Sequence, residues 1–308
     1  MNAFFIRWPS AVLVGVALFI GIAGAQQAPP GRGGQPAAAP AQDFSKIEIK
    51  TTKIGPNFYR LEGSGGIIGI QTGPDGVFMV DSQFAQLTDK IVAAAKQVSD
   101  KPIRFVVNTH LHGDHTGGNE NLANLGVAIV SRDELRAGLA RNTATKPAAL
   151  PMVTYAGSVT FHMNGEDIRL IPVPAAHTSG DTMIRFPVND VIMCGDFYRS
   201  LGYPNIDRNN GGSLKGMLEG FNALIQAAGP NTKIVPGHGE VVTKADVAAH
   251  RDMAMAIRDR VDALVKQGKT LPDVIGAKPT ADYDARVPQG TMTSERFITQ
   301  LYAELGGK

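Results

Sequence analysis

The stretch from His110 to His115 (HLHGDH) places three histidines and one aspartate within six residues. A lone histidine is usually a hydrogen-bonded or surface residue, because histidine is of intermediate burial. Three imidazoles this close would repel one another when protonated and would compete for acceptors when neutral. A divalent cation resolves the conflict by accepting their lone pairs, and Gly113, Gly117 and Gly118 allow a tight turn around it. The pattern therefore predicts a metal site.

Three further candidate ligands follow apolar runs that are typical of buried strands. His177 comes after IPVPAA, Asp196 after VIMCG and His238 after IVPG. His110 in turn follows the run FVVNT. Ligand groups gather at strand ends because a rigid sheet fixes their Cα positions while the loops stay accessible.

The donor types indicate which ion the site prefers. Imidazole and carboxylate donors without thiolates favour Zn²⁺, with iron or manganese as the alternatives. The only cysteine, Cys194, lies two residues before Asp196. We interpret it as a small buried hydrophobe, because free cysteines are often buried; a metal-linked role is the alternative. One thiol forms no internal disulfide, so stability must come from the core.

The elements that must position these groups alternate along the chain. Apolar or β-branched runs bounded by Gly, Pro and Asp predict strands at Phe58–Gly63, Gly66–Thr72, Gly76–Ser82, Ile103–Thr109, Val127–Ser131, Ile168–Pro174, Thr182–Pro187, Asp190–Asp196 and Lys233–Gly239. Helical patterns are found at Leu87–Ser99, with Thr88 as its expected cap, and at Leu214–Ala228, Ala245–Gln267 and Ser294–Leu305. Strand-rich halves with intervening helices predict an α/β layered sandwich of two sheets faced by helices.

The first 25 residues have the pattern of a secretory signal peptide. Arg7 supplies the positive charge, and the apolar run Ala11–Ala25 ends in the small-residue pattern Ala-Gly-Ala. Its 15 residues fall short of the ~20 that span a bilayer, so we expect cleavage rather than an uncleaved anchor, and no stable membrane insertion afterwards. A Pro-, Gly- and Ala-rich linker follows over residues 26–43. The chain is therefore predicted to be periplasmic or secreted.

The composition restricts the partners. The 308 residues are 43% hydrophobic, which is enough for one large core, and the formal net charge is only +2. A near-neutral chain offers no basic stripe of the kind that a nucleic-acid binder needs. We therefore expect a small-molecule substrate and no nucleic-acid partner.

The motifs THLHGDH, HTSGDT, CGD and PGHG occur in the order and approximate spacing of the metallo-β-lactamase fold superfamily, which the chain resembles over roughly residues 45–265. The resemblance implies an αββα four-layer sandwich with a two-metal site between its sheets. It places the catalytic domain at 44–268, followed by a C-terminal extension over 269–308 that includes the terminal helix.

The resemblance also assigns a role to each ligand. One ion would be held by His110, His112 and His177, and the second by Asp114, His115 and His238, with Asp196 bridging the two and Asp81 supporting the metal-binding loop. Two cations about 3.5–4 Å apart can share a hydroxide and polarise the bond that it attacks. With two Zn²⁺ ions per chain and Asp114 accepting the proton, the implied reaction is hydrolysis.

Departures from family patterns narrow the substrate class. Flavodiiron-type oxidoreductases carry a glutamate in place of His112, and two subclasses of zinc β-lactamases carry cysteine or serine in place of Asp196. Asp196 instead resembles hydroxyacylglutathione hydrolases (glyoxalase II) and lactonases. We expect cleavage of an amide or ester bond in a β-lactam, lactone or related molecule.

Three alternatives stay open at this point. They are a thioester hydrolase of the glyoxalase II type, an iron-dependent persulfide oxygenase and a non-catalytic metal-binding protein. The export signal and the lack of a dense Lys/Arg cluster near the C-terminus weigh against the glyoxalase assignment. A non-catalytic protein would be expected to have lost a ligand, and none is missing.

Arg199 is the candidate for binding the substrate. It lies three residues after Asp196, where zinc β-lactamases with cysteine at the bridging position often carry a lysine that binds the substrate carboxylate. An arginine could bind that carboxylate through two parallel hydrogen bonds. The alternative is a solvated loop arginine, or one paired with Asp207.

Overall fold

The computed structural model describes residues 42–288 and 290–307, and the chain from Asp43 onward forms one compact unit. The predicted signal peptide and nearly all of the predicted linker lie outside the described residues. The first element is the short 3-10 helix η1 (Phe44–Lys46), which is capped by the side chain of Asp43. None of the helices in the described ranges combines the length and apolar character needed to cross a membrane.

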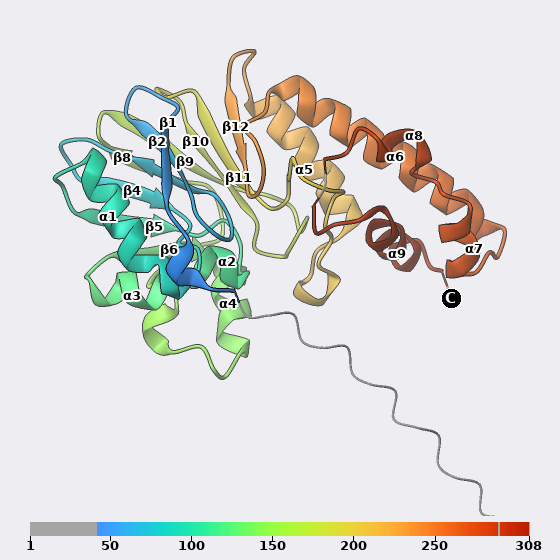
Figure 1. Cartoon of the computed structure of the whole chain (residues 1–308), viewed down its shortest axis with the longest axis horizontal. Coiled ribbons are helices and arrows are strands. Elements are labelled where there is room, and N and C mark those ends of the chain that lie inside the picture. Colours follow the sequence, from blue (N-terminus) through green and yellow to red (C-terminus); the bar gives the residue numbers. More distant parts are fainter. Residues whose placement is uncertain (1–41, 289, 308) are drawn as a thin grey trace, which may run out of the picture. The chain divides into compact units, whose positions relative to one another are not determined.

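The larger of two sheets has seven strands in chain order (Figure 1). They are β1 (Lys50–Lys53), β2 (Phe58–Glu62), β3 (Ile68–Gln71), β4 (Val77–Val80), β5 (Ile103–Val107), β6 (Ala128–Arg132) and β7 (Val153–Tyr155). The strands β1 to β4 pair antiparallel, whereas β4 to β7 pair parallel. Parallel pairing makes β4 and β5 end at the same edge of the sheet, where their following loops lie side by side.

The second sheet has five strands in the order β12-β11-β10-β9-β8. They are β8 (Val159–Met163), β9 (Glu166–Pro172), β10 (Thr182–Phe186), β11 (Val191–Gly195) and β12 (Lys233–Pro236). Only β11 and β12 pair parallel, so both of these strands end at one edge. Asp196 directly follows β11, and His238 comes two residues after the end of β12.

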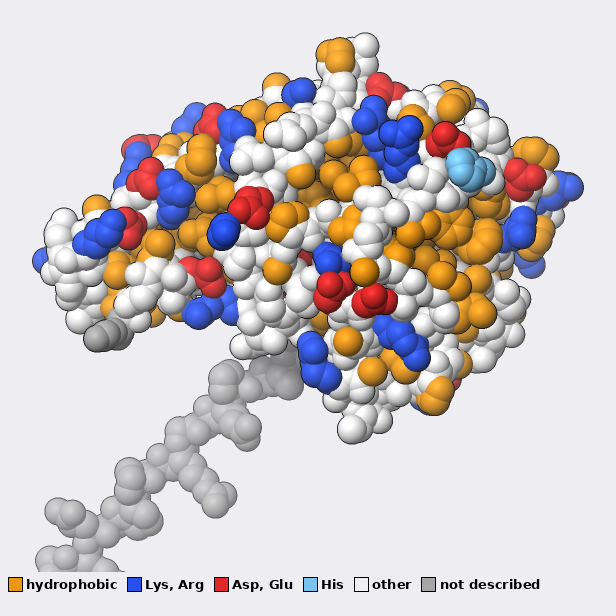
Figure 2. Space-filling view, turned by 180° about the vertical axis from the view of Figure 1, so that it is seen from behind, with side chains coloured by type: hydrophobic (Ala, Val, Ile, Leu, Met, Phe, Trp, Pro, Cys, Tyr) orange, Lys and Arg blue, Asp and Glu red, His pale blue; other side chains and the backbone are white. Residues whose placement is uncertain are grey.

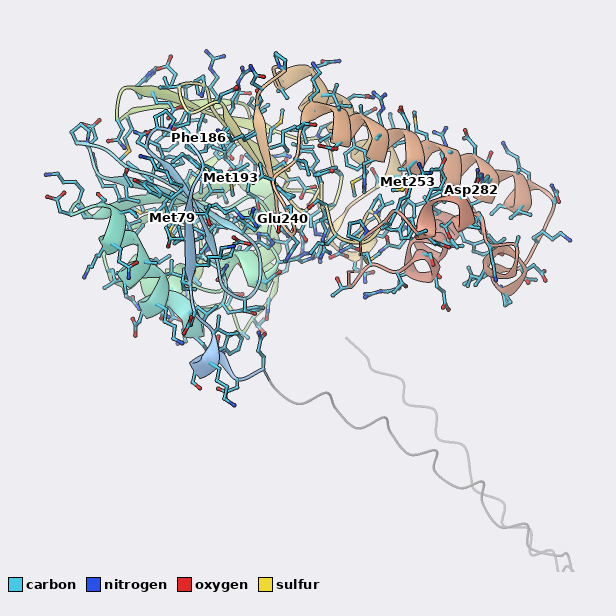
Figure 3. The ribbon with its side chains drawn as sticks, turned by 45° about the horizontal axis from the view of Figure 1, so that its top comes forward. Met79, Phe186, Met193, Glu240, Met253 and Asp282 are labelled. Atoms are coloured by element: carbon cyan, nitrogen blue, oxygen red, sulfur yellow. The ribbon has the colours of Figure 1, made fainter. Side chains whose placement is uncertain are left out.

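A layer of buried aromatic and aliphatic side chains lies between the two sheets. Phe58 of the first sheet packs against Phe186 of the second with ring centroids 4.6 Å apart, and Phe78 contacts Phe186 at 5.9 Å. Met193, on β11, belongs to the same cluster (Figure 3). The sheets therefore pack face to face through large apolar side chains.

Helices cover the outer faces. α1 (Thr88–Val98) and α3 (Asn119–Asn124) pack on the first sheet through a cluster that includes Ile91 and Leu122. α5 (Leu214–Ala227) and α6 (Lys244–Lys266) pack on the second sheet. The four layers form an αββα sandwich, so the predicted fold is confirmed.

The chain after α6 contributes to the same core. It forms α7 (Leu271–Gly276), α8 (Ala281–Asp284) and α9 (Ser294–Glu304), which confirms the terminal helix. Phe297 and Leu301 of α9 are fully buried in the cluster that also holds α5 and α6. The C-terminal extension is thus packed onto the outer helical layer.

Several elements differ from the predictions. The strands β1, β7 and β8 were not predicted. The same holds for the helices α2 (Gly113–Thr116), α3, α4 (Asp133–Arg141), α7 and α8 and for the 3-10 turns η1, η2 (Ala85–Leu87), η3 (Pro147–Ala149) and η4 (Arg208–Asn210). The prediction that Thr88 caps α1 is wrong. The chain enters α1 through the 3-10 turn η2, and the Thr88 hydroxyl donates backward to the carbonyl of Ala85 instead of accepting from the helix.

Candidate metal centre

The loops after four strands bring the predicted ligands together. The loop after β5 carries the HLHGDH motif and begins α2, while His177, Asp196 and His238 follow β9, β11 and β12. Side chains of seven predicted ligands fall into three groups whose ligand atoms lie within 4.8 Å of one another: His110, His112 and His177; His110, His115 and Asp196; Asp114, His115 and His238.

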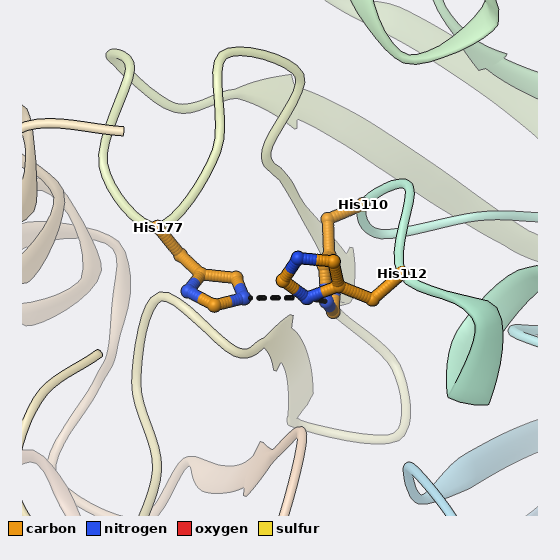
Figure 4. Close-up of side chains that lie close together, drawn as sticks. All are labelled: His110, His112 and His177. Atoms are coloured by element: carbon orange, nitrogen blue, oxygen red, sulfur yellow. Dashed lines mark hydrogen bonds between the residues drawn. The ribbon is translucent and has the colours of Figure 1, made fainter. Parts of the chain in front are cut away.

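The first group consists of three imidazoles (Figure 4). Nδ1 of His112 lies 3.2 Å from Nε2 of His110 and 3.0 Å from Nε2 of His177. Three nitrogen atoms therefore converge on one point, although the side chains come from two different loops. This arrangement matches the donor set predicted for the first ion.

The outward nitrogens of this group are held by oxygen atoms. Nδ1 of His177 donates to the backbone carbonyl of Asn205 at 2.7 Å. Nε2 of His112 lies 2.8 Å from Oδ2 of Asp207, and a carboxylate at that position accepts the proton. These contacts fix the tautomers in which the inner nitrogens carry lone pairs, as in other histidines that bind metals.

The group of Asp114, His115 and His238, which we call the second group, joins a carboxylate to two imidazoles. Oδ2 of Asp114 lies 3.1 Å from Nε2 of His238 and 3.7 Å from Nε2 of His115. The other nitrogen of His115, Nδ1, lies 2.7 Å from Oδ2 of Asp81. Asp81 also accepts from the backbone N–H and the hydroxyl of Thr109, each at 2.8 Å, so it ties His115 to the loop that precedes His110.

Asp196 lies between the two groups. Its Oδ1 is 3.3 Å from Nε2 of His115 and 3.4 Å from Nε2 of His238. Its Oδ2 is 3.9 Å from Nε2 of His177, on the side of the first group. One carboxylate oxygen therefore faces each group, which is the placement that a bridging ligand needs.

Two buried polar atoms without hydrogen-bond partners support a metal ion at this site, independently of the sequence motifs. Nε2 of His115 and Oδ1 of Asp196 are buried and make no hydrogen bond to any described residue, although they lie only 3.3 Å apart. A buried polar atom without a partner costs about 1–3 kcal/mol. Both atoms point into the site, so a cation held there would satisfy both.

The pKa values of the site reflect burial and the nearby carboxylates. Burial lowers the pKa of His177 to about 4 and holds that of His110 well below its usual value, so both imidazoles stay neutral. Burial also opposes protonation of His115, but Asp81 and Asp196 outweigh it and raise that pKa. Burial opposes ionisation of Asp196, yet His115 and His238 hold its pKa well below the usual range.

Two glycines allow close approach to the ligands. A Cβ added to Gly66 would lie 2.1 Å from the ring of His115, and one added to Gly237 would lie 1.9 Å from Oδ1 of Asp196. Gly117 and Gly118 are also closely packed, whereas a Cβ at Gly113 would meet open space. The expectation that glycines let the turn fold tightly thus applies to Gly117 and Gly118 and not to Gly113.

Arg199 is placed differently from both alternatives considered for it. Its side chain is only 9% exposed, and its Nε lies 3.8 Å from Oδ2 of Asp196. Its Nη2 donates to the hydroxyl of Thr291 at 3.4 Å. A solvated arginine, or one paired with Asp207, is therefore wrong, because the guanidinium turns inward toward Asp196 and Asp207 binds His112 instead. Its role as a substrate anchor stays a prediction.

Cys194 is buried on β11. Its side chain is 1% exposed, its Sγ donates to the carbonyl of Val235, and burial raises the pKa of the thiol. The prediction of a small buried residue is confirmed.

Sequence reasoning missed three residues that hold the ligands. Asn205 and Asp207 contact His177 and His112 as described above. Asp181 accepts from the backbone N–H groups of His177 and Thr178, and burial raises its pKa to about 7. Asp181 lies in the HTSGDT motif, four residues after a ligand, and that spacing could have identified it.

Two cavities lie beside the first group. One of about 490 Å³ is lined by His112 together with Leu111, Leu139, Asn142 and Lys146. Another of about 850 Å³ is lined by Asp207 together with Arg208, Arg296 and Gln300. Both have the size of a small-molecule site, for which cavities of about 300–1,000 Å³ are typical.

The chain belongs to the metallo-β-lactamase superfamily, since residues 63–238 match the profile of the "Metallo-beta-lactamase superfamily". The predicted family is confirmed. The chain is also 29% identical over 137 residues to a hydroxyacylglutathione hydrolase of Nitrosococcus oceani, a match that covers 44% of this chain and 48% of that protein. This chain thus spans about half the length of that relative.

Two more similarities bear on the assignment. Over 112 residues the chain is 32% identical to an N-acyl homoserine lactonase of Bacillus thuringiensis, covering 32% of this chain and 44% of the lactonase. Among solved structures, a metallo-beta-lactamase from Pontibacter korlensis superimposes with a TM-score of 0.57 at 21% identity, covering 67% of this chain and 99% of that one. The structural match supports the fold, and the named relatives are hydrolases, in agreement with the predicted enzyme class.

Proposed function

We propose that this protein is a dinuclear zinc hydrolase that cleaves an ester or amide bond of a small molecule, such as a lactone or a β-lactam. The observation that carries the proposal is the placement of Asp196, with one carboxylate oxygen toward each of two ligand groups. A protein that bound a single structural ion would have no use for a second complete group.

The residues would divide the work between two ions. His110, His112 and His177 would hold the first ion, and Asp114, His115 and His238 the second, with Asp196 bridging. Bound zinc ions would supply Lewis acidity and a water molecule activated at neutral pH. The first ion would have three imidazole ligands and the bridging carboxylate, and the second would have two imidazoles and two carboxylates. Zinc binds both kinds of donor, so both sets suit it.

Asp114 is the residue best placed to move a proton. Its side chain is 27% exposed, whereas Asp196 is 5% exposed. Burial opposes ionisation of Asp114, but the hydrogen bond with the His238 imidazole at 3.1 Å and the charge of the nearby His115 outweigh it and lower the pKa of Asp114. An ionised, accessible carboxylate can accept a proton from an attacking water and return it to the leaving group.

The substrate would enter beside His112. The cavity of about 490 Å³ there combines apolar Leu111 and Leu139 with polar Asn142 and Lys146. It would suit a compact molecule with one apolar part and a few polar groups. The names of the relatives, an acylglutathione hydrolase and a lactonase, favour an ester-type bond over an amide.

A thioester hydrolase of the glyoxalase II type is the second candidate. The relative from Nitrosococcus oceani carries that activity in its name, and Arg208 and Arg296 line a cavity next to Asp207, where an anionic thioester could bind. Against this candidate stands the signal-peptide pattern of residues 1–25, which supports a periplasmic or secreted protein.

A panel of substrates on the purified protein tests the proposal. The chromogenic β-lactam nitrocefin, a homoserine lactone and an acyl thioester would be compared for the wild type, with and without a chelator, and for Asp114→Asn. We expect zinc-dependent turnover of the lactone or the lactam, lost in the variant. Turnover of the thioester alone would favour the second candidate, and no hydrolysis of any of the three by the zinc-loaded protein would contradict a hydrolase of this class.

A further inference from the structure

We propose that Gln300, on the C-terminal helix α9, is a positioning residue for the first ligand group, acting through the segment Asn205–Asp207, which we call the support loop. The inference rests on the proposed dinuclear site. It assigns a function to the C-terminal segment, which lies beyond the part of the chain that matches the superfamily profile.

The support loop holds two of the three imidazoles of the first group. Its first residue, Asn205, accepts from Nδ1 of His177 at 2.7 Å through its backbone carbonyl. Its last residue, Asp207, accepts from Nε2 of His112 at 2.8 Å through its side chain. The Asp207 backbone N–H also donates to the carbonyl of His177 at 2.9 Å. A shift of this loop would therefore reorient both imidazoles together.

Gln300 holds the same loop from the opposite side with both atoms of its amide. Its Oε1 accepts from the backbone N–H of Ile206 at 3.0 Å, and its Nε2 donates to Oδ1 of Asn205 at 2.9 Å. These two contacts hold Asn205 and Ile206 in place, and Ile206 lies between the residue that binds His177 and the residue that binds His112. An amide held at both ends restrains position and orientation together.

The helix that carries Gln300 is itself firmly anchored. Phe297 and Leu301 are fully buried, and Phe297 stacks on Tyr203 with ring centroids 5.7 Å apart and an interplanar angle of 13°. One turn further on, Glu304 accepts from the backbone N–H of Leu214 at 3.2 Å and pairs with Arg208 at 2.9 Å. Residues four apart share one helix face, so α9 presents Gln300 and Glu304 together to the chain that follows β11.

The second ligand group has a different support. Nδ1 of His115 is held by Asp81, which follows β4 in the first sheet and, among the described residues, makes no hydrogen bond or ion pair with α9. His177 and His112 of the first group are therefore held by the chain that follows β11, whereas His115 of the second group is held from the first sheet. This asymmetry predicts that a change at Gln300 lowers the affinity for the first ion and leaves the affinity for the second ion unchanged.

Three variants test the proposal. Gln300→Ala removes both contacts, Gln300→Glu keeps the acceptor for the Ile206 N–H but loses the donor to Asn205, and Thr299→Ala is the matched control on the exposed side of α9. Zinc affinity of both sites would be measured by chelator competition. Loss of groups that orient ligands typically weakens metal binding 10–100-fold, and we expect about tenfold for Gln300→Ala at one site, an intermediate loss for Gln300→Glu and none for Thr299→Ala.

A second readout does not require metal. In metal-free protein labelled with ¹⁵N at histidine, the ring N–H groups of His177 and His112 should exchange faster with water in Gln300→Ala, while the His115 N–H held by Asp81 should not change. Thermal unfolding would show that each variant is folded. Equal loss of both ions, or unchanged affinity and exchange in Gln300→Ala, would overturn the proposal. Wild type that binds no zinc would instead contradict the proposed function, and the exchange experiment would still decide the role of Gln300.

Discussion

Nδ1 of His115 lies 2.7 Å from Oδ2 of Asp81, although the two residues are 34 positions apart and follow different strands. Asp81 has a positive φ of 62°, which directs its carboxylate from the end of β4 into the loop after β5. Backbone in this region is uncommon for residues other than glycine, and aspartate and asparagine tolerate it best. A ligand of the second group is thus oriented by backbone geometry in the neighbouring strand.

Asp81→Asn should lower the affinity for the second ion about 10–100-fold. Asparagine keeps the positive φ but has one acceptor oxygen for three donors, which come from Thr109 and His115. Zinc competition titrations would measure the loss, with Asp89→Asn on the exposed first turn of α1 as the control. Unchanged binding of both ions would show that Asp81 does not orient His115.

Asp114→Asn should lower kcat by 10²-fold or more while the protein stays folded. The substitution removes the proton acceptor and weakens a ligand of the second group, but the side chain is partly exposed and supports little of the core. Steady-state kinetics on the best substrate and thermal unfolding would be compared with wild type. Turnover near the wild-type rate would rule out Asp114 as the proton acceptor.

Arg199→Ala should raise KM for a substrate that bears a carboxylate and have much less effect on a neutral lactone. The guanidinium lies 3.8 Å from Oδ2 of Asp196, so the structure also supplies the competing explanation, in which Arg199 positions Asp196. The measurement is kcat/KM on one anionic lactam and one neutral lactone. Equal losses on both would show that Arg199 acts through Asp196 and would end its assignment as a substrate anchor.

His250 should make the protein less stable as the pH falls from about 6.5 to 4. It packs in α6 against the rings of Tyr198 and Phe221, with centroids 5.1 and 5.5 Å away, and burial lowers its pKa to about 4. An unfolded chain has a histidine pKa of about 6.5, so between these values the unfolded state binds the additional proton and is favoured. The effect at pH 4 is at most roughly 3 kcal/mol.

His250→Phe removes this titration and keeps a ring of similar shape beside a cavity of about 520 Å³ that can accommodate its extra atoms. Urea unfolding of wild type and variant at pH 7.5 and pH 5 gives the change in the free energy of unfolding on acidification. Other buried histidines titrate in both proteins, so only the difference between the two changes is informative. An equal loss of stability in wild type and variant would contradict the assignment.

The candidate ligands could be predicted from the sequence because the pattern that marks each of them lies close to it in the chain. Four of them lie within the six residues from His110 to His115, and each remaining candidate follows a strand whose apolar run is visible in the sequence. The groups that orient them could not be predicted in this way. Asp207 is 95 positions from His112, and Gln300 is 95 positions from Asn205, so only the folded chain brings each pair together.

The fold shows the same division. The buried strands β4 and β11 are continuous apolar runs and were predicted, whereas β7 has two exposed residues of three and β8 alternates apolar with polar residues instead of forming a continuous run. Edge and half-exposed strands carry less hydrophobic pattern, because solvent replaces one of their packing partners. On the face in Figure 2, Lys and Arg side chains are interspersed with Asp and Glu among the described residues.

The metal content of the protein tests the central claim most directly. Protein purified without a chelator and analysed for metals, before and after addition of zinc, should contain close to two ions per chain, because the described residues supply two complete ligand groups joined by Asp196. Asp196→Ala should reduce the content of both. A content of one ion per chain that does not rise when zinc is added would contradict the dinuclear site.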